Sequence, residues 1–98
     1  MADEHLYVVT YDISDDRRWR AGFKLMHGYG EWMQLSVFQC RLVRARYVEL
    51  IQKLEALISS TEDAVMIVDI GRADVVVPRV HCMGKRGFAP IERAPVIV

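Results

Sequence analysis

Long apolar runs are missing from this chain. No stretch approaches the roughly 18 apolar residues that a membrane span needs, and the acidic start, MADEHLYVVTYD, has no basic region of the kind that opens an export signal. The 98 residues are also too few for a second hydrophobic core. We therefore expect a single-domain cytoplasmic protein with no membrane partner.

Cysteine and paired metal ligands are scarce as well. Cys40 lies in a strand-like run and Cys82 in a loop-like one, without the close pairing of a zinc site. The three histidines, His5, His27 and His81, have no ligand spacing with one another. We expect two reduced structural thiols and no histidine-based metal site.

Net charge is zero, but the two signs are unevenly distributed along the chain. Residues 1–16 carry five acids and no Lys or Arg, whereas residues 17–53 carry eight bases and two acids, a difference of 8 − 2 = +6. Basic surface beside carboxylates suits a polyanion, because Lys and Arg neutralise phosphates while carboxylates hold a divalent cation. Solvated helix faces are the alternative explanation.

The first half of the chain reads as strand, helix and strand. Residues 6–13, LYVVTYDI, are rich in β-branched and aromatic residues and predict a buried strand. A helix follows, capped by Ser14 or Asp15 with Asp16 in its first turn, and HGYG ends it. Its predicted core stripe is Trp19, Phe23 and Met26. Residues 31–42 alternate as β structure, either one strand or a bent hairpin, since no Gly, Pro or Asn marks a turn.

The second half predicts one more helix, one more strand and a tail. Residues 44–59 carry a helical apolar stripe, Tyr47, Ile51, Leu54 and Ile58, and residues 63–70 read as a second interior strand. Glycines and prolines then break residues 73–98 into short extended pieces such as VVVPRV and PVIV. Such a tail has no core of its own, so we expect it to lie on another surface, such as a partner subunit.

This order of elements favours an α+β fold. We expect a ferredoxin-like βαββαβ sandwich with two helices on one sheet face, a core domain over residues 1–72 and an extra C-terminal strand within the tail of residues 73–98. The other sheet face then needs a cover. Because 52% of the residues are hydrophobic and mean hydropathy is slightly positive, we expect a homodimer.

Asp12, which closes the first apolar strand, is the first candidate for chemistry. A carboxylate at such a place needs an ion pair, a hydrogen bond or a cation. One reading is a structural ion pair with Arg17 or Arg18; the other is a Mg²⁺ ligand that takes part in attack at phosphorus. Two copies of Asp12 meeting across a dimer axis would give a more complete metal site.

Phosphate contacts are the second kind of candidate role. Arg17, Arg18 and Arg20 lie too near the helix start to favour its dipole, so phosphate contact fits them better. Ser36 could donate to a phosphate, or be an ordinary strand serine, and Phe38 suits interface packing better than base stacking. The basic segment MGKRG, residues 83–87, is a further loop that could touch DNA.

Three segments together resemble a known family. YDISDDRR at the end of the first strand, GEWMQLSVFQCRL before the second helix and EDAVMIVDIG after it are similar to the CRISPR-associated "Cas two" family of small ferredoxin-like adaptation proteins. The similarity spans roughly the first 70 residues in order and spacing.

The resemblance implies a symmetric dimer at the centre of the spacer-acquisition integrase, bound to its catalytic partner subunit and to protospacer duplex DNA. It also implies a Mg²⁺-dependent endonuclease that acts on RNA or duplex DNA, with Asp12 as catalytic metal ligand and Tyr11 beside it. Arg17, Arg18, Ser36 and Phe38 match family positions, and the terminal strand would cross to the other subunit. We favour the DNA-binding scaffold with this nuclease activity as a family attribute, and a toxin-like RNA interferase of the same fold is the alternative.

Overall fold

The computed structural model describes residues 3–84 of the chain. Its elements in chain order are β1 (Glu4–Asp12), α1 (Asp16–His27), β2 (Gly30–Gln34), β3 (Val37–Val43), α2 (Arg44–Leu57) and β4 (Ala64–Arg72). The predicted extra C-terminal strand with PVIV, and most of the MGKRG loop, lie outside the described residues. Neither helix in this range is long and apolar enough to cross a membrane.

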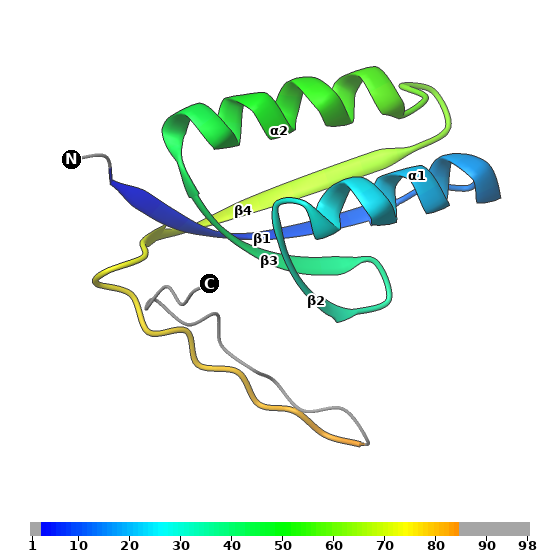
Figure 1. Ribbon diagram of the computed structural model, residues 1–98. Coiled ribbons are helices and arrows are strands. Elements are labelled where there is room, and N and C mark those ends of the chain that lie inside the picture. Colours follow the sequence, from blue (N-terminus) through cyan, green and yellow to red (C-terminus); the bar gives the residue numbers. More distant parts are fainter. Residues whose placement is uncertain (1–2, 85–98) are drawn as a thin grey trace.

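The strands form one antiparallel sheet in the order β2-β3-β1-β4, and both helices cover the same face of it (Figure 1). The predicted α+β class is confirmed, and the observed βαββαβ order agrees with the predicted ferredoxin-like arrangement. In the register, Thr10 pairs with Val37 and Asp12 with Ala64. The end of β1 therefore lies beside the start of β3 and the start of β4.

The core fills the space between the sheet and the helices. Side chains alternate along a strand, so every second residue of β1 and of β3 points toward the helices. The fully or almost fully buried residues that result are Tyr7, Val9, Tyr11, Phe38, Cys40, Leu42, Met26, Leu50 and Leu54. This core holds β1 in the middle of the sheet, with its acidic end at the sheet's margin.

Helix α1 begins and ends where its sequence predicts. The Asp15 side chain accepts a hydrogen bond from the backbone N–H of Arg18 at 2.9 Å, and Asp16 lies in the first turn. Met26 is fully buried, while Trp19 and Phe23 pack against the core from a half-buried position. Gly28 is the C-cap residue. The predicted cap and core stripe are confirmed.

Residues 31–42, for which the sequence allows either one strand or a bent hairpin, form a hairpin. β2 and β3 are joined at Leu35 and Ser36, and Leu35 adopts a positive φ of 44°. The turn thus uses a leucine in the left-handed region, where glycine or asparagine is the usual residue, which explains the missing sequence signal. Gly30, at the start of β2, is required by close packing, because a Cβ there would collide with the backbone oxygen of Gln39 and with Cys40 Sγ.

Leu35→Asn should stabilise the fold. The leucine side chain is exposed, so little packing is lost, and asparagine adopts the left-handed region at lower cost. We expect the free energy of unfolding in urea to rise by about 0.5 to 1 kcal/mol. Gln34→Asn, one residue earlier in β2, is the matched control and should bring no gain. Equal effects of the two changes would contradict the turn assignment.

Helix α2 is buried along a slightly different line from the predicted one. Leu54 of the predicted stripe is almost fully buried, but the residue buried most completely is Leu50, which the prediction omitted. Tyr47, Ile51 and Ile58 are only partly buried. The helix ends at Leu57, two residues before the predicted end.

The prediction that the last strand is interior is wrong. Within the sheet formed by residues 3–84, β4 is an edge strand, paired on one side with β1. Its Val65 and Ile67 pack toward the helices, whereas Met66, Val68 and Ile70 on the opposite face are 61%, 44% and 37% exposed. We call these three exposed residues the apolar outer face. The sequence of β4 predicts an interior strand because the residues on both of its faces are apolar. Periodicity alone does not show that one of these faces is left exposed.

The two thiols differ in their surroundings. Cys40 is fully buried, and burial raises its pKa to about 12, so it is an unreactive core residue as predicted. Cys82 is exposed in the single chain, so it takes no part in the core of residues 3–84.

Candidate nucleic-acid interface

Asp12 is exposed at the end of β1, opposite Ala64. Its carboxylate forms no hydrogen bond or ion pair with any side chain in residues 3–84, so the predicted alternative of an ion pair with Arg17 or Arg18 is wrong there. The carboxylate is therefore accessible to a ligand from solvent.

Arg18 is bound inside the chain. Its Nε donates to Asp63 Oδ2 at 2.8 Å, and its Nη2 donates to Asp63 Oδ1 at 3.2 Å and to Glu62 Oε1 at 3.1 Å. The pKa of the guanidinium is raised, chiefly by Asp63. Three of its donors are used by these two carboxylates, so phosphate contact is not its main role.

Asp63 connects the two loops at this end of the sheet. Besides Arg18, it accepts hydrogen bonds from the backbone N–H of Ser59 at 2.8 Å and of Ser14 at 3.2 Å. The carboxylate is fully buried by these partners, and its pKa is lowered to about 2, first by Arg18 and then by Ser59. The β1–α1 loop, which follows Asp12 and carries Asp15, is thereby fixed to the α2–β4 loop. Sequence reasoning missed Asp63, because its partner lies 45 residues away and no local pattern links them.

Arg17 and Arg20 are exposed near the start of α1 and make no ion pair within the described residues. Residues three and seven positions apart share a helix face, so Lys24 lies on the same face as these two arginines. Lys24 is also exposed and without an ion-pair partner among residues 3–84. This face of α1 therefore presents three positive charges that the fold does not neutralise.

Ser36 lies beside the end of β1, where its side chain supports the hairpin turn. Its Oγ accepts a hydrogen bond from Trp19 Nε1 at 2.9 Å, and its backbone carbonyl accepts one from the N–H of Tyr11 at 3.1 Å. Burial raises the pKa of the Tyr11 phenol, and the neighbouring Ser36 hydroxyl offsets part of this rise. Although near Ser36, the phenol is not aligned for a hydrogen bond with any residue that the structure describes. The Ser36 hydroxyl still has its own proton to donate.

Phe38, for which the sequence favours interface packing, and Tyr11, the neighbour of Asp12, are both core residues of the single chain. Phe38 is 0% exposed and lies 5.6 Å, centroid to centroid, from Phe23, while Tyr11 is 6% exposed. Residues with so little surface stabilise the fold of their own chain and have nothing to offer a second subunit. The Phe38 side chain points toward the helices because it alternates with Val37 and Gln39 along β3.

The carboxylates near β1 do not form a complete metal site in one chain. No group of three or more His, Cys, Asp or Glu side chains in residues 3–84 is arranged to hold a metal ion. Mg²⁺ keeps several waters and takes only one or two carboxylates, together with substrate phosphates. Asp12, exposed and unpaired, fits as one such ligand, whereas Asp15 is used as the helix cap.

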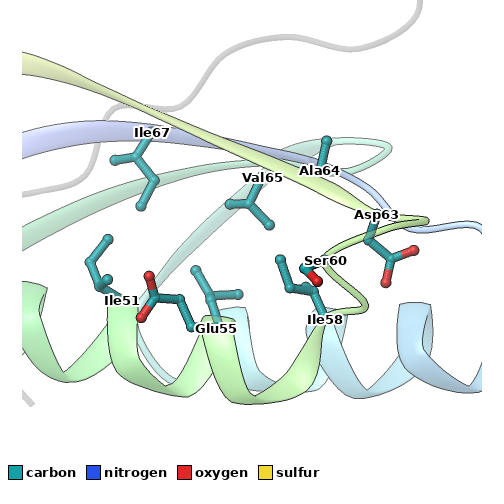
Figure 2. A pocket seen from close by; sticks show the side chains of 9 residues that line it. Ile51, Glu55, Ile58, Ser60, Asp63, Ala64, Val65 and Ile67 are labelled. Atoms are coloured by element: carbon teal, nitrogen blue, oxygen red, sulfur yellow. The ribbon is translucent and has the colours of Figure 1, made fainter.

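A separate apolar cavity of about 420 Å³ lies between α2 and β4 (Figure 2). Its walls include Ile51 and Ile58 on one side and Val65 and Ile67 on the other, and Asp63 stands at the end where β4 begins. Apolar walls together with the carboxylates of Glu55 and Asp63 do not suit a phosphate, so the candidate nucleic-acid interface is at Asp12 and along α1.

Comparison with known proteins agrees with this geometry. The sequence profile of the family described as CRISPR associated protein Cas2 matches residues 5–76. The chain is 52% identical over 95 residues to the CRISPR-associated endoribonuclease Cas2 of Geobacter sulfurreducens, which covers 97% of this chain and 99% of the relative. It is 48% identical over 95 residues to the CRISPR-associated endoribonuclease Cas2 1 of Rhodospirillum rubrum, covering 97% and 92%.

A solved structure gives the same result at the level of the fold. The hypothetical protein TT1823 from Thermus thermophilus superposes with a TM-score of 0.74 and 33% identity, over 87% of this chain and 96% of that one. The family profile spans most of the chain, including the end of β1 and all of α1. The predicted resemblance is therefore confirmed, and this chain belongs to the CRISPR associated protein Cas2 family.

Proposed function

We propose that the chain is a cytoplasmic, dimeric, nucleic-acid-binding subunit of the machinery that integrates CRISPR spacers. The observation that supports this most directly is the pair Arg17 and Arg20, which are exposed near the start of α1 and have no ion-pair partner among the described residues. Such guanidinium groups are available for phosphates. The proposed ligand is protospacer duplex DNA, with single-stranded RNA as a second candidate, and the proposed protein partner is the integrase subunit.

The apolar outer face supports the dimer. Met66, Val68 and Ile70 lie on the sheet face opposite the helices, and the chain after β4 leaves on that side of the sheet (Figure 1). Val75, Val77 and Met83 in that segment are 68%, 84% and 84% exposed in the single chain. A second copy would bury both sets, with residues 1–72 as the core domain and residues 73–98 as a tail on the partner.

Metal-dependent phosphodiester cleavage is the second proposed activity. The relatives from Geobacter sulfurreducens and Rhodospirillum rubrum carry the name endoribonuclease, and the accessible carboxylate of Asp12 favours the same chemistry in this chain. Mg²⁺, when bound, supplies an activated water and charge stabilisation at phosphorus. Asp12 from each copy would hold the ion, and Arg17 would orient the phosphate. No feature of the fold favours the toxin-like alternative.

Asp12→Asn separates the two proposed activities. The change removes the negative charge that holds Mg²⁺ but keeps the size of the side chain. We expect Mg²⁺-dependent cleavage of RNA or duplex DNA to fall at least about 100-fold, because the metal supplies several kcal/mol to the transition state. Duplex affinity, measured by fluorescence anisotropy, should change less than about twofold, because phosphate contacts come from arginines.

Asp16→Asn is the matched control, since Asp16 is an exposed carboxylate four residues later in the first turn of α1. It should retain cleavage. If cleavage persisted in Asp12→Asn, the metal assignment would fail. If the unchanged protein bound no polynucleotide at low ionic strength, the scaffold function would fail as well.

A further inference from the structure

A basic notch lies between the two helices, away from Asp12. It has a volume of about 530 Å³ and is lined by residues from the end of α1, the turn that follows it and α2, among them Lys24, Gly28, Tyr29, Arg46 and Lys53. Three of these five residues are cationic. Both helices cover one face of the sheet (Figure 1), so the notch between them lies on the opposite side of the sheet from the apolar outer face.

Glu49 holds Arg46 and Lys53 in place and offsets only one of the three positive charges of the notch. Its Oε1 accepts from Arg46 Nη1 at 3.1 Å, and its Oε2 lies 3.3 Å from Lys53 Nζ. The pKa of Glu49 is lowered, first by Lys53, so it is ionised at neutral pH. The three cations and this single anion leave the notch with a charge of about +2, since Lys24 has no ion-pair partner in residues 3–84.

Arg46 is oriented before any ligand arrives. Its Nη2 donates to the backbone carbonyl of Gly28 at 3.0 Å, and its guanidinium carbon lies 4.2 Å from the centre of the Tyr29 ring. Two of its five N–H groups are used in these contacts with Gly28 and Glu49, which leaves three for a ligand. A guanidinium fixed in this way loses little side-chain entropy on binding an anion.

The notch continues the positive face of α1. Arg17, Arg20 and Lys24 share that face, and Lys24 is also part of the notch wall. Seven residues of helix span about 10 Å, which corresponds to about three successive phosphates at 3.4 Å of axial rise per nucleotide. A row of cations at this spacing, ending in an arginine of fixed orientation, matches the successive phosphates of a nucleic-acid strand better than an isolated phosphate.

We propose that one strand of a bound nucleic acid lays its sugar–phosphate backbone along α1 and into this notch, where Lys24, Arg46 and Lys53 contact phosphates. The inference rests on the proposed nucleic-acid binding and extends it to a second contact region on the helical face. The proposed contacts are to phosphates, and phosphate contacts position a nucleic acid without reading its sequence.

The test compares the double variant Lys24→Gln/Lys53→Gln with the unchanged full-length chain, using a fluorescein-labelled duplex and anisotropy. At 50 mM salt we expect affinity to fall on the order of tenfold for each cation removed, and the slope of log K against log salt to fall by about 0.9 per cation. Glu49→Gln should act in the opposite sense and tighten binding several-fold, because it removes the one anion at the notch.

The matched control is Arg44→Gln/Arg72→Gln, which removes the same charge elsewhere. Arg44 lies over Tyr47 on the other side of α2, and Arg72 pairs with Asp74 at the end of β4. This control should bind like the unchanged chain.

Two outcomes would overturn the inference alone. One is Lys24→Gln/Lys53→Gln binding the duplex normally while Arg17→Gln/Arg20→Gln binds weakly. The other concerns ATP, measured with the same proteins. If Lys24→Gln/Lys53→Gln lost ATP binding but kept the duplex affinity of the unchanged chain, the notch would be a site for a free nucleotide. An unchanged chain that binds no polynucleotide would overturn both this inference and the proposed function, so the two failures are distinguishable.

Discussion

Asp63→Asn should lower the melting temperature by roughly 10 °C, one of the two largest effects that we expect from a single structural element. The carboxylate is fully buried and accepts hydrogen bonds from Arg18, Ser14 and Ser59. An asparagine has one acceptor oxygen, and its NH₂ group would face at least one of these N–H donors without a hydrogen bond. The change also removes the negative charge opposite Arg18. Because the half-buried guanidinium of Arg18 is left without its main partner, both loops at the end of β1 should loosen.

The same residue predicts a pH dependence with a definite sign. The pKa of Asp63 is lowered to about 2 in the folded chain, from an ordinary value near 4. A lowered carboxyl pKa means that its contribution to stability is complete above about pH 4 and is lost as the pH falls toward 2. Thermal melts between pH 6 and pH 2 should therefore show a steeper acid loss in the unchanged chain than in Asp63→Asn.

Glu62→Gln is the matched control for this experiment. Glu62 also accepts from Arg18, at 3.1 Å, but its side chain is 63% exposed. An exposed ion pair contributes little to stability, so the melting temperature of Glu62→Gln should differ from that of the unchanged chain by no more than about 2 °C. If Asp63→Asn and Glu62→Gln had the same melting temperature, the two loops would not depend on the buried carboxylate.

Charge reversal at Arg17 and Arg20 should have the largest effect on binding. Arg17→Glu/Arg20→Glu places two anions on the face of α1 where two exposed cations have no ion-pair partner in residues 3–84. Each reversal removes a phosphate contact and adds repulsion of the backbone. We expect duplex affinity at 50 mM salt to fall by about 100-fold or more, with a clearly flatter salt dependence.

Arg18 is unsuitable for this experiment despite its place between the two, since reversing it would break the contact with Asp63. Arg44→Glu/Arg72→Glu is the control, because these residues lie at the start and end of elements far along the sheet from Asp12. Circular dichroism should show both variants folded. Retained duplex binding in Arg17→Glu/Arg20→Glu would rule out the helix α1 face as the contact surface.

Local patterns predicted most of the fold. Asp15 and Asp16 define the start of α1 through hydrogen bonding and charge within four residues, and Gly28 marks its end. The apolar run before Asp12 predicted β1, because burial and β-branching act on the same short segment. These features are decided by neighbours in the chain, which is why the sequence suffices for them.

Contacts between distant segments were not predictable in this way. Three arginines within four positions look equivalent in sequence, but only Arg18 meets Asp63, whose position depends on the pairing of β4 with β1. Phe38 was assigned to an interface because alternation gives two faces without saying which faces the helices. The turn at Leu35 lacked a signal because its backbone conformation is imposed by the flanking strands.

The exposed edge of β4 has a consequence for the newly made chain. In the sheet of the described residues, β4 is paired on one side only, and its unpaired edge lies next to the exposed Met66, Val68 and Ile70. Such an edge is a template onto which strands of any other chain can add. Formation of the proposed dimer would therefore compete with aggregation from the moment of synthesis, and a low concentration of the chain would favour the monomer with its edge uncovered.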